Sequence, residues 1–168
     1  QSGGTAIFAE NSAPVTNRGV FEILGSGSEF LHTGGDLHIT KGLNSGSSNS
    51  VILQPETYNV TNSTFTLGSL YTPASSPDIR LLSDIPLNNL KTDNSSGNFF
   101  DVRLVDDLTL TGDLEIVSNT RIIQMANLDL FLAGDLINNG ILFTVVNTTL
   151  YLNGTNDQTF FGNSNLYN

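Results

Sequence analysis

The chain has 168 residues, with 16 acidic and 6 basic side chains and neither cysteine nor tryptophan. The formal net charge of −10 argues against nucleic acid or an anionic membrane as a partner, and the basic residues are scattered singly along the sequence. The absence of cysteine excludes disulfides and thiolate metal sites. No apolar run reaches the roughly 18 residues that a membrane span needs.

Asparagine and glycine shape the composition, with 20 Asn and 16 Gly residues. Both tolerate left-handed backbone conformations, so we expect the chain to turn often and sharply. Only 13% of the residues are charged, which is about half the usual fraction. A surface built from Ser, Thr and Asn is typical of extracellular proteins.

Short apolar runs bounded by turn residues follow one another along the chain. The runs at 20–24, 101–105 and 141–146 each predict a strand of about five residues. No stretch of about twelve residues keeps helical apolar spacing without Gly, Pro or a cluster of Asn. The sequence therefore predicts an all-β fold.

One short motif recurs. Residues 108–114 (LTLTGDL) are repeated at 130–136 (LFLAGDL), more weakly at 150–154 (LYLNG), and in an earlier partial copy at 31–37 (LHTGGDL). Alternating apolar residues point to one side of a strand, the glycine lets the chain turn a corner, and the leucine after the aspartate points back inward. A period of about 20 to 22 residues fits one coil of a parallel β-helix. The same strands also permit an antiparallel β-sandwich as an alternative.

Residues 69–98 are less regular and hold three of the five prolines, Pro73, Pro77 and Pro86. We expect an irregular, loop-bearing region here, within a single β-solenoid segment that spans residues 1–168. A linker between two shorter solenoids is the alternative. The apolar runs at 79–82 and 98–102, which flank the polar stretch, favour the single solenoid.

The C-terminal half resembles a known kind of repeat. The runs 134–140 (GDLINNG), 150–162 (LYLNGTNDQTFFG) and 165–168 (NLYN) are similar to repeats of adhesin-like Bacteroidota surface proteins exported by the type IX secretion system. The resemblance covers residues 108–168 well and residues 1–60 loosely. It implies a right-handed parallel β-helix, an adhesive or scaffolding role, and a secreted or cell-surface location. It carries no catalytic residues and no cofactor.

The resemblance also implies partners: neighbouring segments of the same long polypeptide, secretion or cell-surface components, and glycans. Because the sequence stops within a repeat at Asn168, we expect it to be part of a longer protein. Its start at Gln1, without an initiator Met, fits signal-peptide cleavage, and a piece of a longer chain would look the same.

The aspartates of the motif are candidates for a metal site. Asp36, Asp113 and Asp135 would stack in register if the copies are successive coils, and such a carboxylate ladder can bind Ca²⁺. An aspartate after glycine is also a common turn residue that caps backbone N–H groups, and we favour this role. His32 and His38 flank Asp36, but we expect them to be surface residues without a function.

Asp106 and Asp107, with Asp101 and Arg103 nearby, form the densest charge cluster of the sequence. Parallel β-helix polysaccharide lyases and hydrolases use acidic clusters with a basic residue on one face. A cleft holding Asp101, Arg103 and Asp106 would indicate such an enzyme fragment. We expect a solvated strand face and no catalysis.

Exposed aromatic side chains can stack on sugar rings. The candidates for such contacts are Tyr58, Tyr71, Tyr151, Phe160, Phe161 and Tyr167, although a Phe–Phe pair more often closes a solenoid core. The sequence thus predicts a non-enzymatic structural or adhesive module that binds glycans or other surface components. A carbohydrate-active enzyme fragment and a passenger segment of a secretion system are the alternatives.

Overall fold

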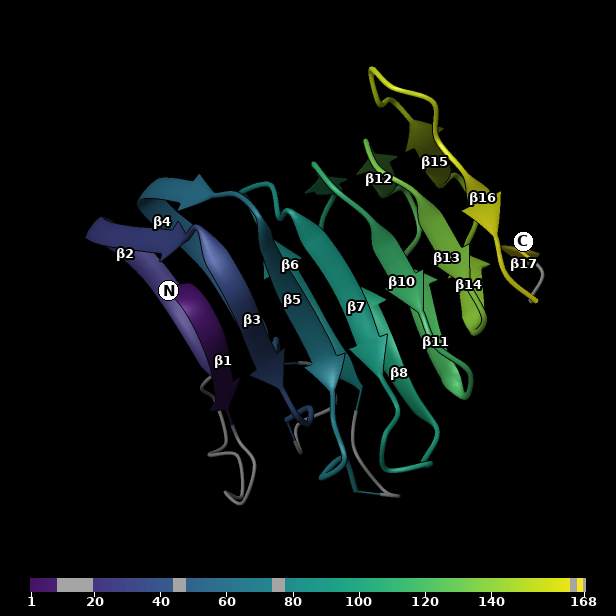
Figure 1. The fold of residues 1–168 in the computed structure, drawn as a ribbon, viewed down its shortest axis with the longest axis horizontal. Helices are drawn as coiled ribbons and strands as arrows, with labels where there is room; N and C mark the ends of the chain where they lie inside the picture. Colours follow the sequence, from purple (N-terminus) through teal and green to yellow (C-terminus); the bar gives the residue numbers. More distant parts are fainter. Residues whose placement is uncertain (9–19, 44–47, 74–77, 164–165, 168) are drawn as a thin grey trace.

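The computed structural model describes residues 1–8, 20–43, 48–73, 78–163 and 166–167. These residues form 17 strands and no helix, so the predicted all-β class is confirmed (Figure 1). The described part of the chain accordingly offers no helix with the length and apolar character to cross a membrane.

The strands assemble into three sheets, here named A, B and C. Sheet A contains β1 (Ser2–Phe8), β3 (Gly34–Ile39), β5 (Ser63–Gly68), β7 (Asn89–Asp93), β10 (Leu114–Ile116), β13 (Leu136–Asn138) and β16 (Phe160–Phe161). Sheet B contains β2 (Phe21–His32), β4 (Val51–Val60), β6 (Ile79–Ser83), β8 (Phe100–Leu104), β11 (Thr120–Gln124), β14 (Ile141–Thr144) and β17 (Leu166–Tyr167). Sheet C contains β9 (Leu108–Leu110), β12 (Asp129–Leu132) and β15 (Thr149–Leu152).

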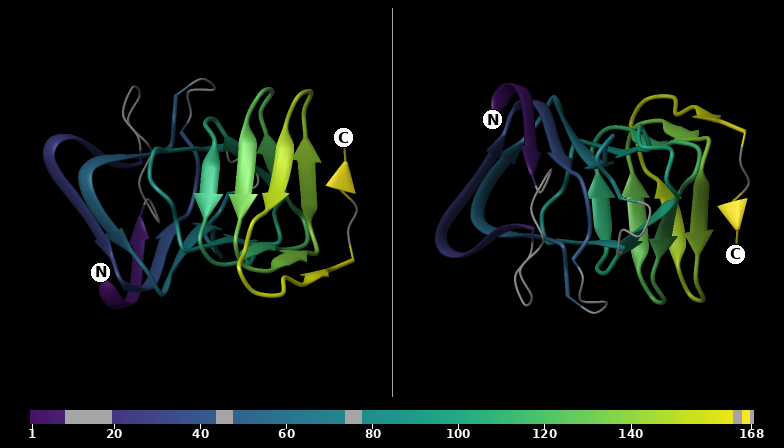
Figure 2. Two further views of the ribbon diagram at one scale, coloured as in Figure 1. Left: turned by 90° about the horizontal axis from the view of Figure 1, so that it is seen from above. Right: turned by 90° about the horizontal axis from the view of Figure 1, so that it is seen from below.

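Consecutive strands along the chain belong to different sheets. Within one sheet, each strand pairs in parallel with the next strand of that sheet in chain order. We call the stretch from one strand to the next strand of the same sheet a coil. Figure 2 shows the strands side by side along the long axis, with the two termini at opposite ends. The arrangement is consistent with a β-helix. The antiparallel sandwich is wrong for the described strands, because every pairing between them is parallel.

The core is built from the inward positions of these short strands. Leu108 and Leu110 of β9 are buried while Thr109 between them is exposed, as period-2 alternation predicts. Leu108 pairs with Leu130, and Leu130 with Leu150, so that leucines form a column along the axis. Burying one such side chain contributes about 1.5–3 kcal/mol to the free energy of unfolding.

Residues that pair between successive coils are further apart in the sequence in the N-terminal half. Phe21 pairs with Val51 and Gly35 with Ser63, whereas Leu108 pairs with Leu130, at the spacing of the sequence motif. Sheet C begins only at β9, and before it the isolated bridge from Leu87 to Leu110 takes the place of a strand. Within residues 69–98, β6 and β7 each pair with a strand on both sides, so sheets A and B run through this region.

Asparagines occupy left-handed turn positions, as the composition predicts. The described non-glycine residues with positive φ are Asn62, Asn119, Asn127 and Asn147. Gly112 and Gly134 lie at bends between a strand of sheet C and the next strand, which belongs to sheet A, as the predicted corner requires, although neither has a positive φ. A Cβ on Gly134 would lie 2.6 Å from the carbonyl oxygen of Gly112, so glycine is also needed there for the close stacking of successive coils.

Candidate functional site

The motif aspartates lie on the outer face of sheet A, in one row that also contains other residues. Asp36 pairs with Thr64 and Thr64 with Asn89, while Leu90 pairs with Leu114, one position after Asp113. Thr64 and Asn89 therefore separate Asp36 from Asp113, and the predicted ladder of three adjacent carboxylates is not formed.

Asp113 and Asp135 cap the backbone of the next coil. Asp113 Oδ1 accepts a hydrogen bond from the N–H of Asp135 (2.8 Å), and Asp135 Oδ1 accepts one from the N–H of Thr159 (2.7 Å). Asn89 Oδ1 does the same for the N–H of Asp113 (2.8 Å). The three acceptors thus link successive coils along sheet A.

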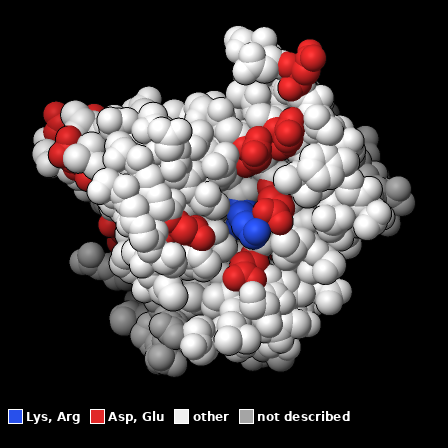
Figure 3. All heavy atoms as spheres, viewed as in Figure 1, with Lys and Arg blue, Asp and Glu red and all other residues white. Residues whose placement is uncertain are grey.

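The remaining charges on this face are mostly paired with each other. Asp36 lies 2.6 Å from the ring of His38 and accepts a hydrogen bond from Thr66, and Lys91 lies 2.9 Å from Glu115. A cavity of about 310 Å³ lies along the row. Figure 3 shows this face with one basic group among several carboxylates. No group of three or more metal-ligating His, Asp or Glu side chains occurs among the described residues.

Sheet B carries an ion-pair network that includes Asp101 and Arg103 of the predicted charge cluster. Arg121 donates to both carboxylate oxygens of Asp101 (2.8 and 2.5 Å), and Arg103 bonds Asp78 and lies 4.0 Å from Asp101. Hydrogen bonding to Asp101 raises the pKa of Arg121 above its ordinary value. Arg80 pairs in register with Arg103. Arg103 and Arg121, which are separated in the sequence, thus both lie beside Asp101 on this sheet.

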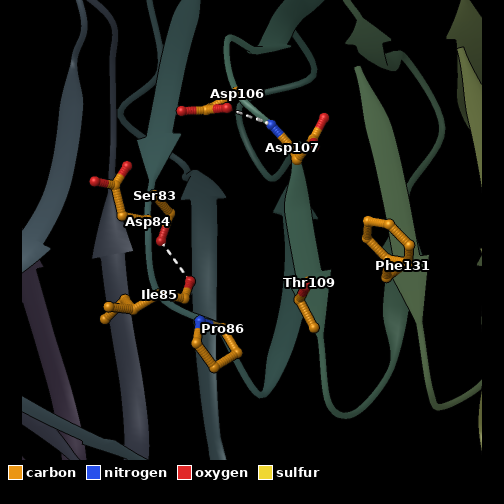
Figure 4. A pocket seen from close by; sticks show the side chains of 8 residues that line it. All are labelled: Ser83, Asp84, Ile85, Pro86, Asp106, Asp107, Thr109 and Phe131. Atoms are coloured by element: carbon orange, nitrogen blue, oxygen red, sulfur yellow. Dashed lines mark hydrogen bonds between the residues drawn. The ribbon is translucent and has the colours of Figure 1, made fainter. Parts of the chain in front are cut away.

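The predicted acidic cluster is divided between two surfaces. Asp101 and Arg103 lie on β8 within the network, whereas Asp106 and Asp107 follow β8 and line a pocket of about 470 Å³. Figure 4 shows this pocket, with Asp84 and Asp106 on one side and Thr109 and Phe131 on the other. Its lining residues are Ser83, Asp84, Ile85, Pro86, Asp106, Asp107, Thr109 and Phe131.

Each carboxylate of this pocket accepts a hydrogen bond from a nearby donor. Asp107 Oδ1 accepts a hydrogen bond from the N–H of Asp129 (2.7 Å), and Asp106 Oδ1 accepts one from the N–H of Asp107 (2.8 Å). Gln54 donates to Asp84 (2.9 Å). Each carboxylate thus keeps a second oxygen available, and no lysine or arginine belongs to the described lining.

An aromatic pair continues the pocket wall along sheet C. Thr109 pairs with Phe131 and Phe131 with Tyr151, so their side chains form a row on the outer face. The rings of Phe131 and Tyr151 stack with centroids 4.9 Å apart, and Tyr151 is 43% exposed. Tyr58 on β4 and Tyr71 after β5 are also exposed but lie on other elements. Among these three tyrosines, Tyr151 alone adjoins the acidic pocket.

Two further predictions concern His32 and the pair Phe160–Phe161. His32 is buried, with 1% of its surface exposed, and is therefore not a surface residue. Burial, followed by the charge of the N-terminus, lowers the pKa of His32 below its ordinary value. Phe160 and Phe161 are both exposed, which fits their place among the stacking candidates and not the alternative that they close the core. The side chain of Tyr167 lies outside the part of the chain that the structure describes.

The sequence missed Asp84 and Phe131 as pocket residues. Phe131 was detectable, because it occupies the outward position between two motif leucines, as Thr109 and Tyr151 do. Asp84 carried no such signal, since it lies in the non-repetitive region. Comparisons with family models, with curated proteins and with solved structures found nothing that matches this chain.

Proposed function

We propose that the chain is a non-enzymatic, structural or adhesive module of a secreted bacterial surface protein, and that it binds glycans at the pocket beside sheet C. The observation that carries this proposal is the position of Phe131, which lines the acidic pocket and stacks on Tyr151. Aromatic rings offer flat apolar faces to the C–H groups of sugars. Carboxylate oxygens accept hydrogen bonds from sugar hydroxyls.

The surroundings of the pocket restrict the sugar class. Asp84, Asp106 and Asp107 all line it, without a basic residue among the described lining. An anionic polysaccharide would meet repulsion at short range, so neutral or amino sugars are the expected ligands. The net charge of −10 would also repel an anionic polysaccharide.

The finer architecture belongs to the same proposal. We take the coils to be those of a right-handed parallel β-helix with a period of 20 to 22 residues in the motif-bearing part, as the resemblance to type IX-secreted Bacteroidota adhesins implies. Neighbouring segments of a longer polypeptide, and components of the secretion system or the cell surface, would then be its partners. A parallel solenoid suits this role because many weak sites can repeat along one axis.

A glycan microarray with the labelled chain tests the proposal, scored for retained protein and for loss of the printed sugar. We expect retention on a narrow set of neutral or amino glycans, and reduced retention for Tyr151→Ala. Tyr58→Ala is the matched control, because Tyr58 is similarly exposed but lies on β4. Equal retention by both variants, or retention on polyuronates alone, contradicts the proposed site.

The alternative function is a fragment of a carbohydrate-active lyase or hydrolase. The presence of three carboxylates in one pocket favours it, since glycoside hydrolysis uses a pair of them. Loss of printed sugar that Asp106→Asn abolishes would establish this alternative over the adhesive module. Silence on the array would favour a scaffold or a secretion passenger.

A further inference from the structure

The pocket beside sheet C contains a row of outward side chains in which a small residue lies between two rings. The bridge between Leu87 and Leu110 places Pro86 beside Thr109, and Thr109 pairs with Phe131 on its other side. Pro86, Thr109 and Phe131 all line the pocket, and Thr109 is exposed. Figure 4 shows the side chain of Thr109 between the rings of Pro86 and Phe131. We call the space above Thr109, between these two rings, the ring slot.

The spacing of the strands sets the width of the ring slot. Pro86 and Phe131 lie on the two strand positions next to Thr109, so their backbones are separated by two strand spacings, about 9.5 Å. A ring held between two walls needs one van der Waals contact of about 3.5–4.0 Å on each side. The slot therefore has room for one sugar ring, and a second ring stacked on the first would not fit.

Both walls of the ring slot are apolar. The ring of Phe131 stacks on Tyr151, which lies on the side of β15, so the free face of Phe131 is turned toward β9 and Thr109. The saturated ring of Pro86 forms the opposite wall. The C–H groups of a sugar can pack against both surfaces. A hydroxyl group that pointed at either wall would lose its hydrogen bonds to water.

The carboxylates of the pocket lie beside the slot and not on its walls. Asp106 and Asp107 come directly before β9, and Asp84 comes two residues before Pro86. Figure 4 shows all three to one side of the row from Pro86 to Phe131. Carboxylate oxygens in this position can accept hydrogen bonds from hydroxyl groups at the edge of a bound ring.

We propose that the ring slot admits one pyranose ring whose hydroxyl groups are all equatorial, and that the small side chain of Thr109 is what keeps the slot open. This inference rests on the proposed function, since it names the class of sugar bound in the same pocket. An all-equatorial ring carries only C–H groups on its two faces and directs its hydroxyl groups outward from its edge. β-Linked glucose and glucosamine units have this form. Galactose and mannose each carry an axial hydroxyl group, which would point at Pro86 or Phe131.

The test compares the unchanged chain with Thr109→Phe and Thr109→Val on the glycan microarray. We expect the unchanged chain to retain β-linked glucose or glucosamine glycans about tenfold better than galactose or mannose glycans, because an axial hydroxyl group is left without a partner. Thr109→Phe should lose this retention, since its ring fills the slot. Thr109→Val, which has the same shape without the hydroxyl group, should keep it.

Thermal unfolding separates loss of the slot from loss of the fold. Phe131 and Tyr151 hold the equivalent outward positions on the next two strands, so a ring at position 109 extends their row, and the midpoint of Thr109→Phe should be no lower than that of the unchanged chain. If this variant does not fold, Pro86→Ala removes one wall instead. Pro86→Ala should reduce the preference for all-equatorial sugars, and an unchanged preference would overturn the slot.

The remaining outcomes distinguish the slot from glycan binding as such. Full retention by Thr109→Phe, or a preference of the unchanged chain for galactose or mannose, would overturn the ring slot and leave the adhesive function standing. Retention of no glycan by the unchanged chain would overturn both proposals.

Discussion

The ring of Phe131 lies nearly parallel to the ring of Tyr151, at an interplanar angle of 7°. Their backbones pair in parallel register, so the stacking follows directly from the geometry of sheet C. In this stacked arrangement each ring covers part of one face of the other, so the opposite faces are those left for a ligand. Because Phe131 also lines the acidic pocket, its free face and the carboxylates can contact one ligand together.

We expect the ring of Tyr151, and not its hydroxyl, to support glycan retention. Tyr151→Phe should keep the affinity, whereas Tyr151→Ala should lower it about tenfold, since a stacked ring contributes roughly 0.5–1.5 kcal/mol beyond the area it buries. Titration calorimetry with a glycan identified on the array measures both. A loss of affinity in Tyr151→Phe would show that the hydroxyl makes the contact.

Asp113 should act as a backbone cap and not as a metal ligand. Asp113→Ala removes the acceptor for the N–H of Asp135 and should cost about 1 kcal/mol of unfolding free energy. Asp113→Asn keeps an acceptor oxygen and should cost less than about 0.5 kcal/mol. Urea unfolding compares the two variants, with and without Ca²⁺. A rise in stability on adding Ca²⁺ that Asp113→Asn removes would instead support the calcium site.

Gly134 should not tolerate a side chain. A Cβ there would overlap the backbone of Gly112, so Gly134→Ala should destabilise the fold by about 1–3 kcal/mol. Gly3→Ala is the control, because nothing lies within 4 Å of a Cβ at Gly3 and its φ is not positive. Thermal unfolding of both variants tests this prediction. Equal unfolding midpoints for Gly134→Ala and Gly3→Ala would contradict close stacking at Gly134.

The stability of the fold should depend on the protonation of His32. Its pKa is lowered in the folded state, so below its ordinary value of 6.5 the unfolded chain binds the proton more readily. Stability should therefore be complete above about pH 6.5 and fall as the pH drops towards the lowered pKa.

Urea unfolding between pH 7.5 and 5 measures this dependence. The slope of the unfolding free energy against pH should become shallower in His32→Phe and stay unchanged in His38→Phe. An identical slope in the unchanged chain and in His32→Phe would show that carboxylates, and not His32, control this range.

The strands of the C-terminal half were predictable because the motif shows the alternation directly. Leu108, Leu130 and Leu114 are buried where the motif places them. The partial copy of the motif at 31–37 predicted a buried Leu31, but Leu31 is exposed on β2. Sheet C has no strand in this part of the molecule. Leu37, after the aspartate, is buried as predicted.

The candidate site was predictable only in part. Asp106, Asp107 and Tyr151 were singled out from charge density and aromatic character. Asp84 reaches the pocket because the pairing of Leu53 with Ser83 sets its place, and no repeat in the sequence specifies that register. The network of Arg103 with Asp78 depends in the same way on pairings between distant strands.

The bridge between Leu87 and Leu110 closes the outer edge of sheet C. Leu87 donates to the carbonyl of Thr109 (3.0 Å) and accepts from the N–H of Thr111 (2.9 Å), so the free side of β9 is already occupied. The preceding residue, Pro86, has no N–H to offer to an incoming strand. A β-strand of another molecule therefore finds no ladder to extend there. The pocket beside sheet C is therefore bordered by a strand edge whose hydrogen bonds are already made within the chain.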